Sequence, residues 1–207
     1  MNVAVLGSGS WATALAKIVM HNVAEINWYI RKQETIDEFR EIRRNPNHLE
    51  WAYFDISRIN FSNDINQVLS EAELVILAVP SPYVKDVLAE ITVDMSQKKV
   101  ISAVKGMIPG DNILVTDYMH QHFHVPEANL GMITGPCHAE EIALERLSYL
   151  TIGCKDTANA TEWKKLFDTP YVRTTPSNDM KGLEYASVMK NIYAIAAGMC
   201  TSLRYGD

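Results

Sequence analysis

Met1-Asn-Val-Ala-Val-Leu-Gly-Ser-Gly-Ser-Trp-Ala-Thr-Ala-Leu-Ala-Lys-Ile-Val-Met20 is the stretch that decides the fold. Residues 3–6 form a short apolar run, which is typical of a buried parallel strand. Gly7-Ser-Gly-Ser-Trp-Ala12 follows and fits the pattern G-x-G-x-x-G/A. Apolar side chains then recur at helical spacing, at positions 12, 16, 19 and 20. A strand, a glycine turn and a helix in this order predict a turn that binds a dinucleotide.

Three residues of this turn have separate expected roles. Gly7 permits the tight turn, Gly9 lets the backbone approach a pyrophosphate, and Ala12 lets the helix pack closely on the strand. The free N–H groups and the positive dipole end of the helix then attract the phosphates. The alternative is a glycine turn in a doubly wound protein that binds no cofactor.

Composition and charge exclude some classes of function for this protein. The chain has 207 residues and a formal net charge of −6, which argues against a general nucleic-acid binder. Its cysteines, Cys137, Cys154 and Cys200, have neither CxxC nor zinc spacing, which indicates a reducing compartment. We expect no signal peptide and no membrane span, and therefore a cytoplasmic location.

Strand-like and helix-like segments alternate beyond the first helix. Predicted strands cover residues 25–30, 73–79, 99–104, 129–134, 148–153 and 170–174. Residues 48–60, which include Trp51, Tyr53 and Phe54, are expected to form an irregular, packed surface loop. A short helix is expected next, with Ser62 or Asn63 as its cap. The alternation predicts a doubly wound, Rossmann-type α/β domain with a mostly parallel sheet over residues 1–178.

The pattern changes after Asp179. Residues 185–200 are apolar nearly all round, and their only charge is Lys190. Such a helix belongs inside a helical domain, so residues 179–207 are predicted to be the first helix of an all-α C-terminal domain, and the chain is expected to be a fragment. An ammonium group buried without a partner is costly, so Lys190 is expected to meet a ligand. A lysine that snorkels or pairs structurally is the alternative.

Ligands of open parallel sheets bind beyond the carboxyl ends of the strands. Lys105 and Gly135 follow two predicted strands directly. Arg31 follows the second strand, where an acidic residue would favour NAD. A guanidinium there can stack on adenine or accommodate a 2′-phosphate, so NADP is allowed and NAD is not excluded. The alternative for Arg31 is a surface basic pair with Lys32.

Two other motifs are interpreted as structural. Cys137 and His138 are neighbours in sequence, and neighbours rarely have the geometry of a catalytic dyad. His120, His122 and His124 leave a metal site open as an alternative, but an exposed helix end is expected there and no metal is predicted.

Five motifs occur in one order and spacing over the chain: residues 7–16, 79–81, 104–106, 134–136 and 190–198. In these motifs the chain resembles the bacterial NAD(P)-dependent glycerol-3-phosphate dehydrogenases. The resemblance implies interconversion of sn-glycerol 3-phosphate and dihydroxyacetone phosphate with NAD or NADP. It further implies a supply of glycerol 3-phosphate for phospholipid synthesis, and a homodimer in the full-length protein.

The resemblance also implies roles for single residues. The nucleotide would be bound by Gly7, Gly9, Ser10, Trp11, Ala12, Arg31, Lys105 and Ala139. The substrate would be bound by Lys105, Gly135, Cys137 and Lys190. Lys190 would be the acid/base and Lys105 would orient the substrate as the second catalytic lysine.

The chain departs from the family pattern in two respects. Cys137 stands where a hydroxyl residue is expected, and a thiol is a weak donor. Most of the family's helical substrate domain is missing, so the chain alone is expected to be inactive. Two alternatives remain open. One is another reductase that combines a Rossmann domain with a helical domain, such as a β-hydroxyacid or 6-phosphogluconate dehydrogenase. The other is a non-catalytic dinucleotide-binding module.

Overall fold

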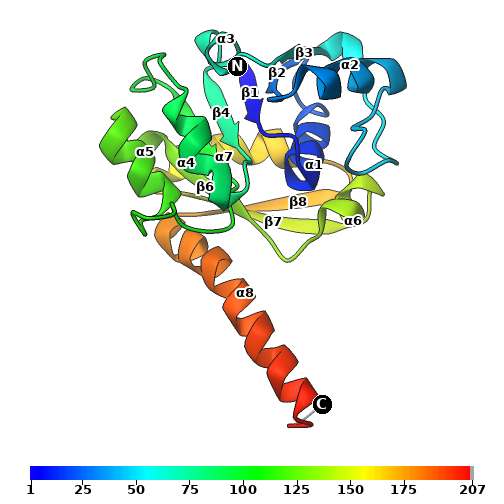
Figure 1. The fold of residues 1–207 in the computed structure, drawn as a ribbon. Coiled ribbons are helices and arrows are strands. Elements are labelled where there is room, and N and C mark those ends of the chain that lie inside the picture. The colour runs from blue at the N-terminus through cyan, green and yellow to red at the C-terminus, as the bar shows by residue number, and fades with distance from the viewer. Residues whose placement is uncertain (206–207) are drawn as a thin grey trace.

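One sheet of eight strands forms the centre of the computed structural model, which describes residues 1–205 (Figure 1). The strand order is β3-β2-β1-β4-β5-β6-β7-β8. The strands are β1 (Val3–Leu6), β2 (Ile26–Tyr29), β3 (Ile59–Ser62), β4 (Leu74–Leu77), β5 (Lys99–Ser102), β6 (Leu130–Thr134), β7 (Ser148–Cys154) and β8 (Val172–Ser177). Neighbouring strands are parallel except for β6 and β7, which are antiparallel. The predicted mostly parallel, doubly wound fold is confirmed.

Helices cover both faces of this sheet. The helices of the described chain are α1 (Ser10–Val19), α2 (Gln33–Ile42), α3 (Ile65–Ser70), α4 (Ser81–Ala89), α5 (Val115–Phe123), α6 (Ala139–Ala143), α7 (Thr157–Phe167) and α8 (Met180–Ser202). Short 3₁₀ turns occupy Ile56–Arg58 and Glu127–Asn129. Alternate residues of β1 enter two separate cores: Val3 and Val5 pack with α1 and α7, whereas Ala4 and Leu6 pack with α3, α4 and α5.

The strand order reverses direction beside β1. The chain runs outward from β1 to β2 and β3 and then returns to β4 on the other side of β1, with Leu6 level with Leu77. The carboxyl ends of β1 and β4 therefore flank the point at which open α/β sheets bind their ligands.

Strand β3 is missing from the sequence prediction, which placed a loop there. Its residues alternate between buried Ile59 and Phe61 and exposed Asn60, because successive side chains point to opposite faces and only one face packs on the core. The predicted cap of the next helix is also wrong. The Asp64 carboxylate accepts hydrogen bonds from the N–H groups of Asn66 and Gln67 and caps α3. Of the three aromatic residues in the preceding loop, Phe54 is buried, and Trp51 and Tyr53 are exposed.

Helix α8 leaves the body of the molecule and runs clear of the sheet (Figure 1). Only Met180, Glu184 and Ser187 of this helix are buried. Lys190 is exposed, so the predicted apolar surroundings of this lysine are wrong for the described chain. The reason is that α8 has no neighbouring helix beyond its first two turns within residues 1–205. Over the same residues, no helix combines the length and apolar character that a membrane crossing requires.

Candidate functional site

The glycine turn after β1 is built by close backbone approach. Gly7 has a φ of +117°, and a Cβ there would lie 2.6 Å from the Ala78 carbonyl oxygen. Glycine is therefore required at this position on both conformational and steric grounds. The Gly7 N–H donates to the Tyr29 oxygen at 3.2 Å, and the Trp28 indole N–H donates to the Gly7 oxygen at 2.7 Å. These contacts fix the turn between β1, β2 and β4.

Asn45 fixes the next residue of the turn. It is buried, and its amide donates to the Ser8 oxygen at 2.9 Å and to Thr13 Oγ1 at 2.8 Å. The carbonyl oxygens of Gly7 and Ser8 thus accept hydrogen bonds from protein donors. No local pattern reveals this role, because Asn45 reaches a turn 37 residues earlier in the chain.

The start of α1 offers N–H groups to a ligand. Gly9 is its N-cap, has no side-chain cap within the described chain, and its oxygen accepts the first helical bond from Thr13 N at 3.0 Å. Helix geometry leaves the N–H groups of Ser10, Trp11 and Ala12 without intrahelical acceptors. A Cβ at Gly9 would meet no described atom within 4 Å. This open space beside free N–H groups fits a pyrophosphate.

Two pockets meet at Gly9, Val79 and Pro80. The first has a volume of about 210 Å³, and its lining also includes Gly7, Tyr29, Arg31, His48 and Tyr83. The second has a volume of about 280 Å³, and its lining also includes Ser10, Trp11, Ser81, Ala103 and Lys105. Together they form a depression across the carboxyl ends of β1 and β4, with room on each side of the turn for one half of a dinucleotide.

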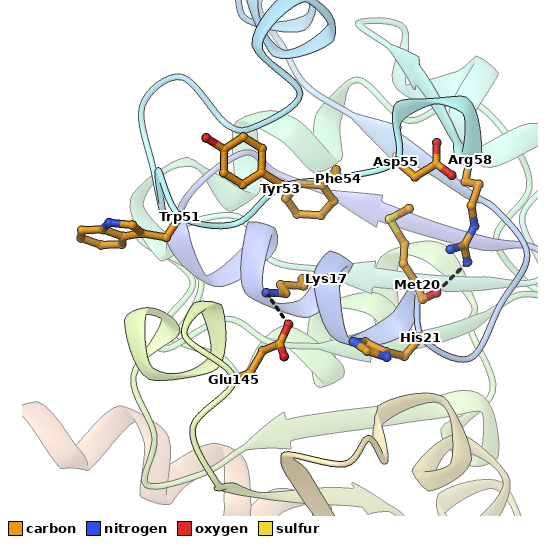
Figure 2. A pocket seen from close by; sticks show the side chains of 9 residues that line it. All are labelled: Lys17, Met20, His21, Trp51, Tyr53, Phe54, Asp55, Arg58 and Glu145. Carbon is orange, nitrogen blue, oxygen red and sulfur yellow. Dashed lines mark hydrogen bonds and ion pairs between the residues drawn. The ribbon is translucent and has the colours of Figure 1, made fainter.

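A larger pocket of about 540 Å³ lies elsewhere, between the second half of α1 and the loop at residues 51–58 (Figure 2). Its charged side chains already have partners. Lys17 pairs with Glu145 at 3.1 Å, and the Arg58 guanidinium donates to the Met20 oxygen at 2.6 Å. Figure 2 shows both contacts along the pocket wall, which leaves few free polar groups for a ligand.

Polar side chains line the first pocket and the adjoining start of α1. Arg31 lies in its lining and is exposed, and its contact with the nucleotide stays a prediction. Ser10 Oγ and His48 Nδ1 lie 3.1 Å apart at the start of α1. The sequence prediction missed His48, because a loop position gives no periodic signal.

Three predicted substrate residues interact electrostatically at the second pocket, whose lining includes Lys105. The Lys105 ammonium lies 4.9 Å from the centre of the Trp11 ring, a cation–π contact. Partial burial lowers the pKa of Lys105, and the charge of Lys190 lowers it further. Cys137 is buried, and burial raises the pKa of its thiol against the opposing effect of Lys105. The thiol is therefore protonated near neutral pH.

Two other predicted site residues have clear structural roles. A Cβ at Gly135 would overlap the Tyr149 carbonyl oxygen, so this glycine allows the chain to pass close to β7. The Ala139 side chain is buried at the start of α6. Contacts of these two residues with substrate or nucleotide stay predictions. Within residues 1–205, His, Cys, Asp and Glu side chains form no group of three or more that could hold a metal.

Known proteins are similar to this chain in both sequence and fold. Residues 2–160 match the family described as NAD-dependent glycerol-3-phosphate dehydrogenase N-terminus, and residues 179–207 match its C-terminus. A glycerol-3-phosphate dehydrogenase (NAD(P)+) from Exiguobacterium sp. is 32% identical over 100% of this chain and 61% of its own length. The Staphylococcus aureus enzyme of that name is 28% identical over 99% of this chain and 62% of its own length.

Solved structures with the same fold include glycerol-3-phosphate dehydrogenases. The glycerol-3-phosphate dehydrogenase of Plasmodium falciparum has a TM-score of 0.90 at 30% identity, covering 100% of this chain and 60% of that one. The Coxiella burnetii enzyme, at 22% identity and a TM-score of 0.84, shares the fold over 100% of this chain and 62% of its own. The chain thus spans about 60% of the length of the relatives it matches. On the match over residues 2–160, with the glycine turn and sheet that carry it, the chain belongs to the NAD-dependent glycerol-3-phosphate dehydrogenase family.

Proposed function

We propose that the protein is an oxidoreductase that interconverts sn-glycerol 3-phosphate and dihydroxyacetone phosphate with NAD or NADP. The observation that carries this proposal is the pair of pockets joined at Gly9, with Arg31 in one and Lys105 in the other. The names of its relatives support the same reaction. Because the chain spans 61% of the Exiguobacterium relative, the substrate step is proposed for a protein that includes the remaining segment.

The proposed cofactor supplies or accepts the hydride when it is bound. The N–H groups of Ser10, Trp11 and Ala12 would bind its pyrophosphate, and the open space at Gly9 would admit it. Arg31 would pair with the 2′-phosphate of NADP through charge-assisted hydrogen bonds. A guanidinium can also stack on adenine, so NAD would bind as well.

Two lysines would act on the substrate. In ketone reduction, Lys190 Nζ would donate a proton to the carbonyl oxygen as negative charge develops there. Lys105 would hold and orient the substrate from its place over Trp11. Its pKa, which burial lowers and the charge of Lys190 lowers further, supports a shared role. The protonated Cys137 thiol would supply at most a weak hydrogen bond.

Several wider features belong to the same proposal. Residues 1–178 would be the cofactor domain and residues 179–207 the first helix of a helical substrate domain. Apolar side chains of α8 are exposed, among them Ile192, Tyr193 and Ile195. They support the proposal that the rest of a helical domain, or a partner, packs over this helix. A homodimer, a cytoplasmic location and a supply of glycerol 3-phosphate for phospholipid synthesis follow from the family resemblance. We do not expect nucleic acid to be a partner.

Two measurements test the proposal. The chain is titrated with NADH and NADPH, followed by the fluorescence of the reduced nicotinamide; absence of saturable binding would contradict the cofactor site. Reduction of dihydroxyacetone phosphate is then assayed in the chain extended by the segment that its relatives have beyond the match. Lys190→Met should lower kcat by about 10²–10⁴ with unchanged cofactor affinity, the usual loss for a general acid. A near-normal kcat would remove Lys190 from the mechanism.

A further inference from the structure

Helix α8 is attached to the rest of the chain through its first two turns. Met180 is buried in the core beside the sheet, and the side chains of Met180 and Leu183 pack over Gly153 of β7. Beyond Ser187 no residue of the helix is buried within the described chain. Whatever fixes these two turns therefore fixes the direction of the whole helix.

Glu184 is the unusual residue in this attachment. It is fully buried, although a buried carboxylate loses its hydration. Its oxygens accept hydrogen bonds from the Thr116 N–H at 3.2 Å and from the Thr116 hydroxyl. Burial raises the pKa of Glu184, and the bonds from Thr116 oppose that rise. The carboxylate is thus held by a partner 68 residues earlier in the chain.

The partner of Glu184 is the start of another helix. Helix α5 begins at Val115, and its N-cap, Leu114, supplies no side-chain hydrogen bond. A carboxylate is favoured at a helix N-terminus because it accepts from free N–H groups and faces the positive end of the dipole. Glu184 therefore caps α5 from outside that helix. An apolar residue could fill the same volume, but it could not fix one orientation of α8 on α5 through hydrogen bonds.

The direction of α8 determines where Lys190 lies. Leu183 and Lys190 are seven residues apart and share one face of the helix. Lys190 therefore lies about 10 Å along the axis from the side chain that packs over β7, at 1.5 Å per residue. At this place its charge acts on both Lys105 and Cys137.

We propose that Glu184 is a positioning residue: by docking α8 onto the start of α5, it fixes the direction of α8 and so the place from which the Lys190 charge acts on Lys105. The catalytic meaning of this placement rests on the proposed function. The placement itself is a property of the chain alone and can be measured without cofactor or substrate.

The first test measures the direction of the helix. Cys200 is the exposed cysteine on α8, whereas Cys137 and Cys154 are buried, so Cys200 takes one nitroxide label. A Lys165→Cys substitution on the exposed side of α7 takes the second. Cys200 lies sixteen residues beyond Glu184, about 24 Å along the axis, so a tilt of about 10° moves the label by about 4 Å.

The expected result distinguishes positioning from general stability. In Glu184→Ala the distribution of distances between the labels should shift or broaden by about 4 Å or more. Glu184→Gln keeps an acceptor oxygen, so its distance distribution should match that of the original chain. Lys181→Ala is the matched control, because it removes an exposed ion pair with Asp117 from the same turn and should change nothing. If Glu184→Ala does not fold, Thr116→Val replaces it, because it removes the donor hydroxyl from the other side.

The second test uses Lys105 as a sensor of Lys190. The pKa of Lys105 is followed by NMR of ¹³C-methylated lysines, with Lys105→Arg for assignment. Glu184→Ala should raise this pKa, because the Lys190 charge moves away, and Glu184→Gln should not. A folded Glu184→Ala chain with unchanged label distances would overturn the proposal, as would a displaced helix with an unchanged Lys105 pKa. Neither readout depends on turnover, so failure of the dehydrogenase proposal would be seen separately.

Discussion

Gly7 and Gly9 belong to one turn, and the structure predicts opposite consequences of adding a methyl group to them. A Cβ at Gly7 would lie 2.6 Å from the Ala78 oxygen, and the φ of +117° disfavours any L side chain. The conformational strain costs about 1–3 kcal/mol, and overpacking costs about 1–3 kcal/mol more. Gly7→Ala should therefore lower the free energy of unfolding by roughly 2–6 kcal/mol.

Gly9→Ala should leave that free energy within about 1 kcal/mol of its original value. An added Cβ meets no described atom, and Gly9 has an ordinary extended conformation with φ −74°. The smaller entropy of the unfolded chain stabilises the variant by about 0.4–1 kcal/mol, while alanine is a poorer N-cap than glycine. The methyl group would stand where the pyrophosphate approaches. Loss of one charge-assisted hydrogen bond, about 1.5–3 kcal/mol, lowers affinity roughly 10- to 100-fold.

Urea unfolding and NADH titration of the two variants provide the assay, and Gly9→Val provides a bulkier version of the second change. If Gly9→Ala and Gly9→Val bind NADH as tightly as the original chain, the pyrophosphate does not approach Gly9. If Gly7→Ala unfolds at the same urea concentration as the original chain, the turn tolerates a side chain at Gly7.

Three further predictions follow from single contacts. Arg31→Ala should weaken NADPH more than NADH, because only NADPH has the 2′-phosphate; an equal loss in two parallel titrations would assign Arg31 to adenine stacking instead. Asn45→Ala should lower the free energy of unfolding by about 1–3 kcal/mol, because it leaves the buried Thr13 hydroxyl and the partly buried Ser8 oxygen without their donor; an unchanged urea midpoint would contradict this. The pKa of Glu184 is raised from 4.5 in the folded chain. Protonated Glu184 therefore stabilises the folded state fully below pH 4.5, and this stabilisation is lost as the pH rises through the folded pKa. Unfolding measured from pH 4 to 7 should therefore show Glu184→Gln gaining stability relative to the original chain, and a difference independent of pH would refute the assignment.

The sequence alone determined those features of the protein that depend on local pattern. The apolar run at residues 3–6, the glycines after it and the alternation of strands with helices predicted a doubly wound sheet and its dinucleotide turn. Positions after strands predicted Arg31 and Lys105 in the pocket lining, because the carboxyl ends of parallel strands share one edge of the sheet. Local periodicity suffices for these features, since each one is encoded within about ten to twenty adjacent residues.

Only the tertiary structure decided which distant residues meet. The edge strand β3 has a short alternating segment that becomes a strand by pairing with β2. Asn45 and His48 reach the glycine turn from a loop, and Trp11 contacts Lys105 from the first turn of α1. Glu184 caps a helix that begins 69 residues before it, and the exposure of Lys190 follows from the direction that α8 then takes. Such contacts join segments far apart in the chain, and no periodicity within one segment records its partner in another.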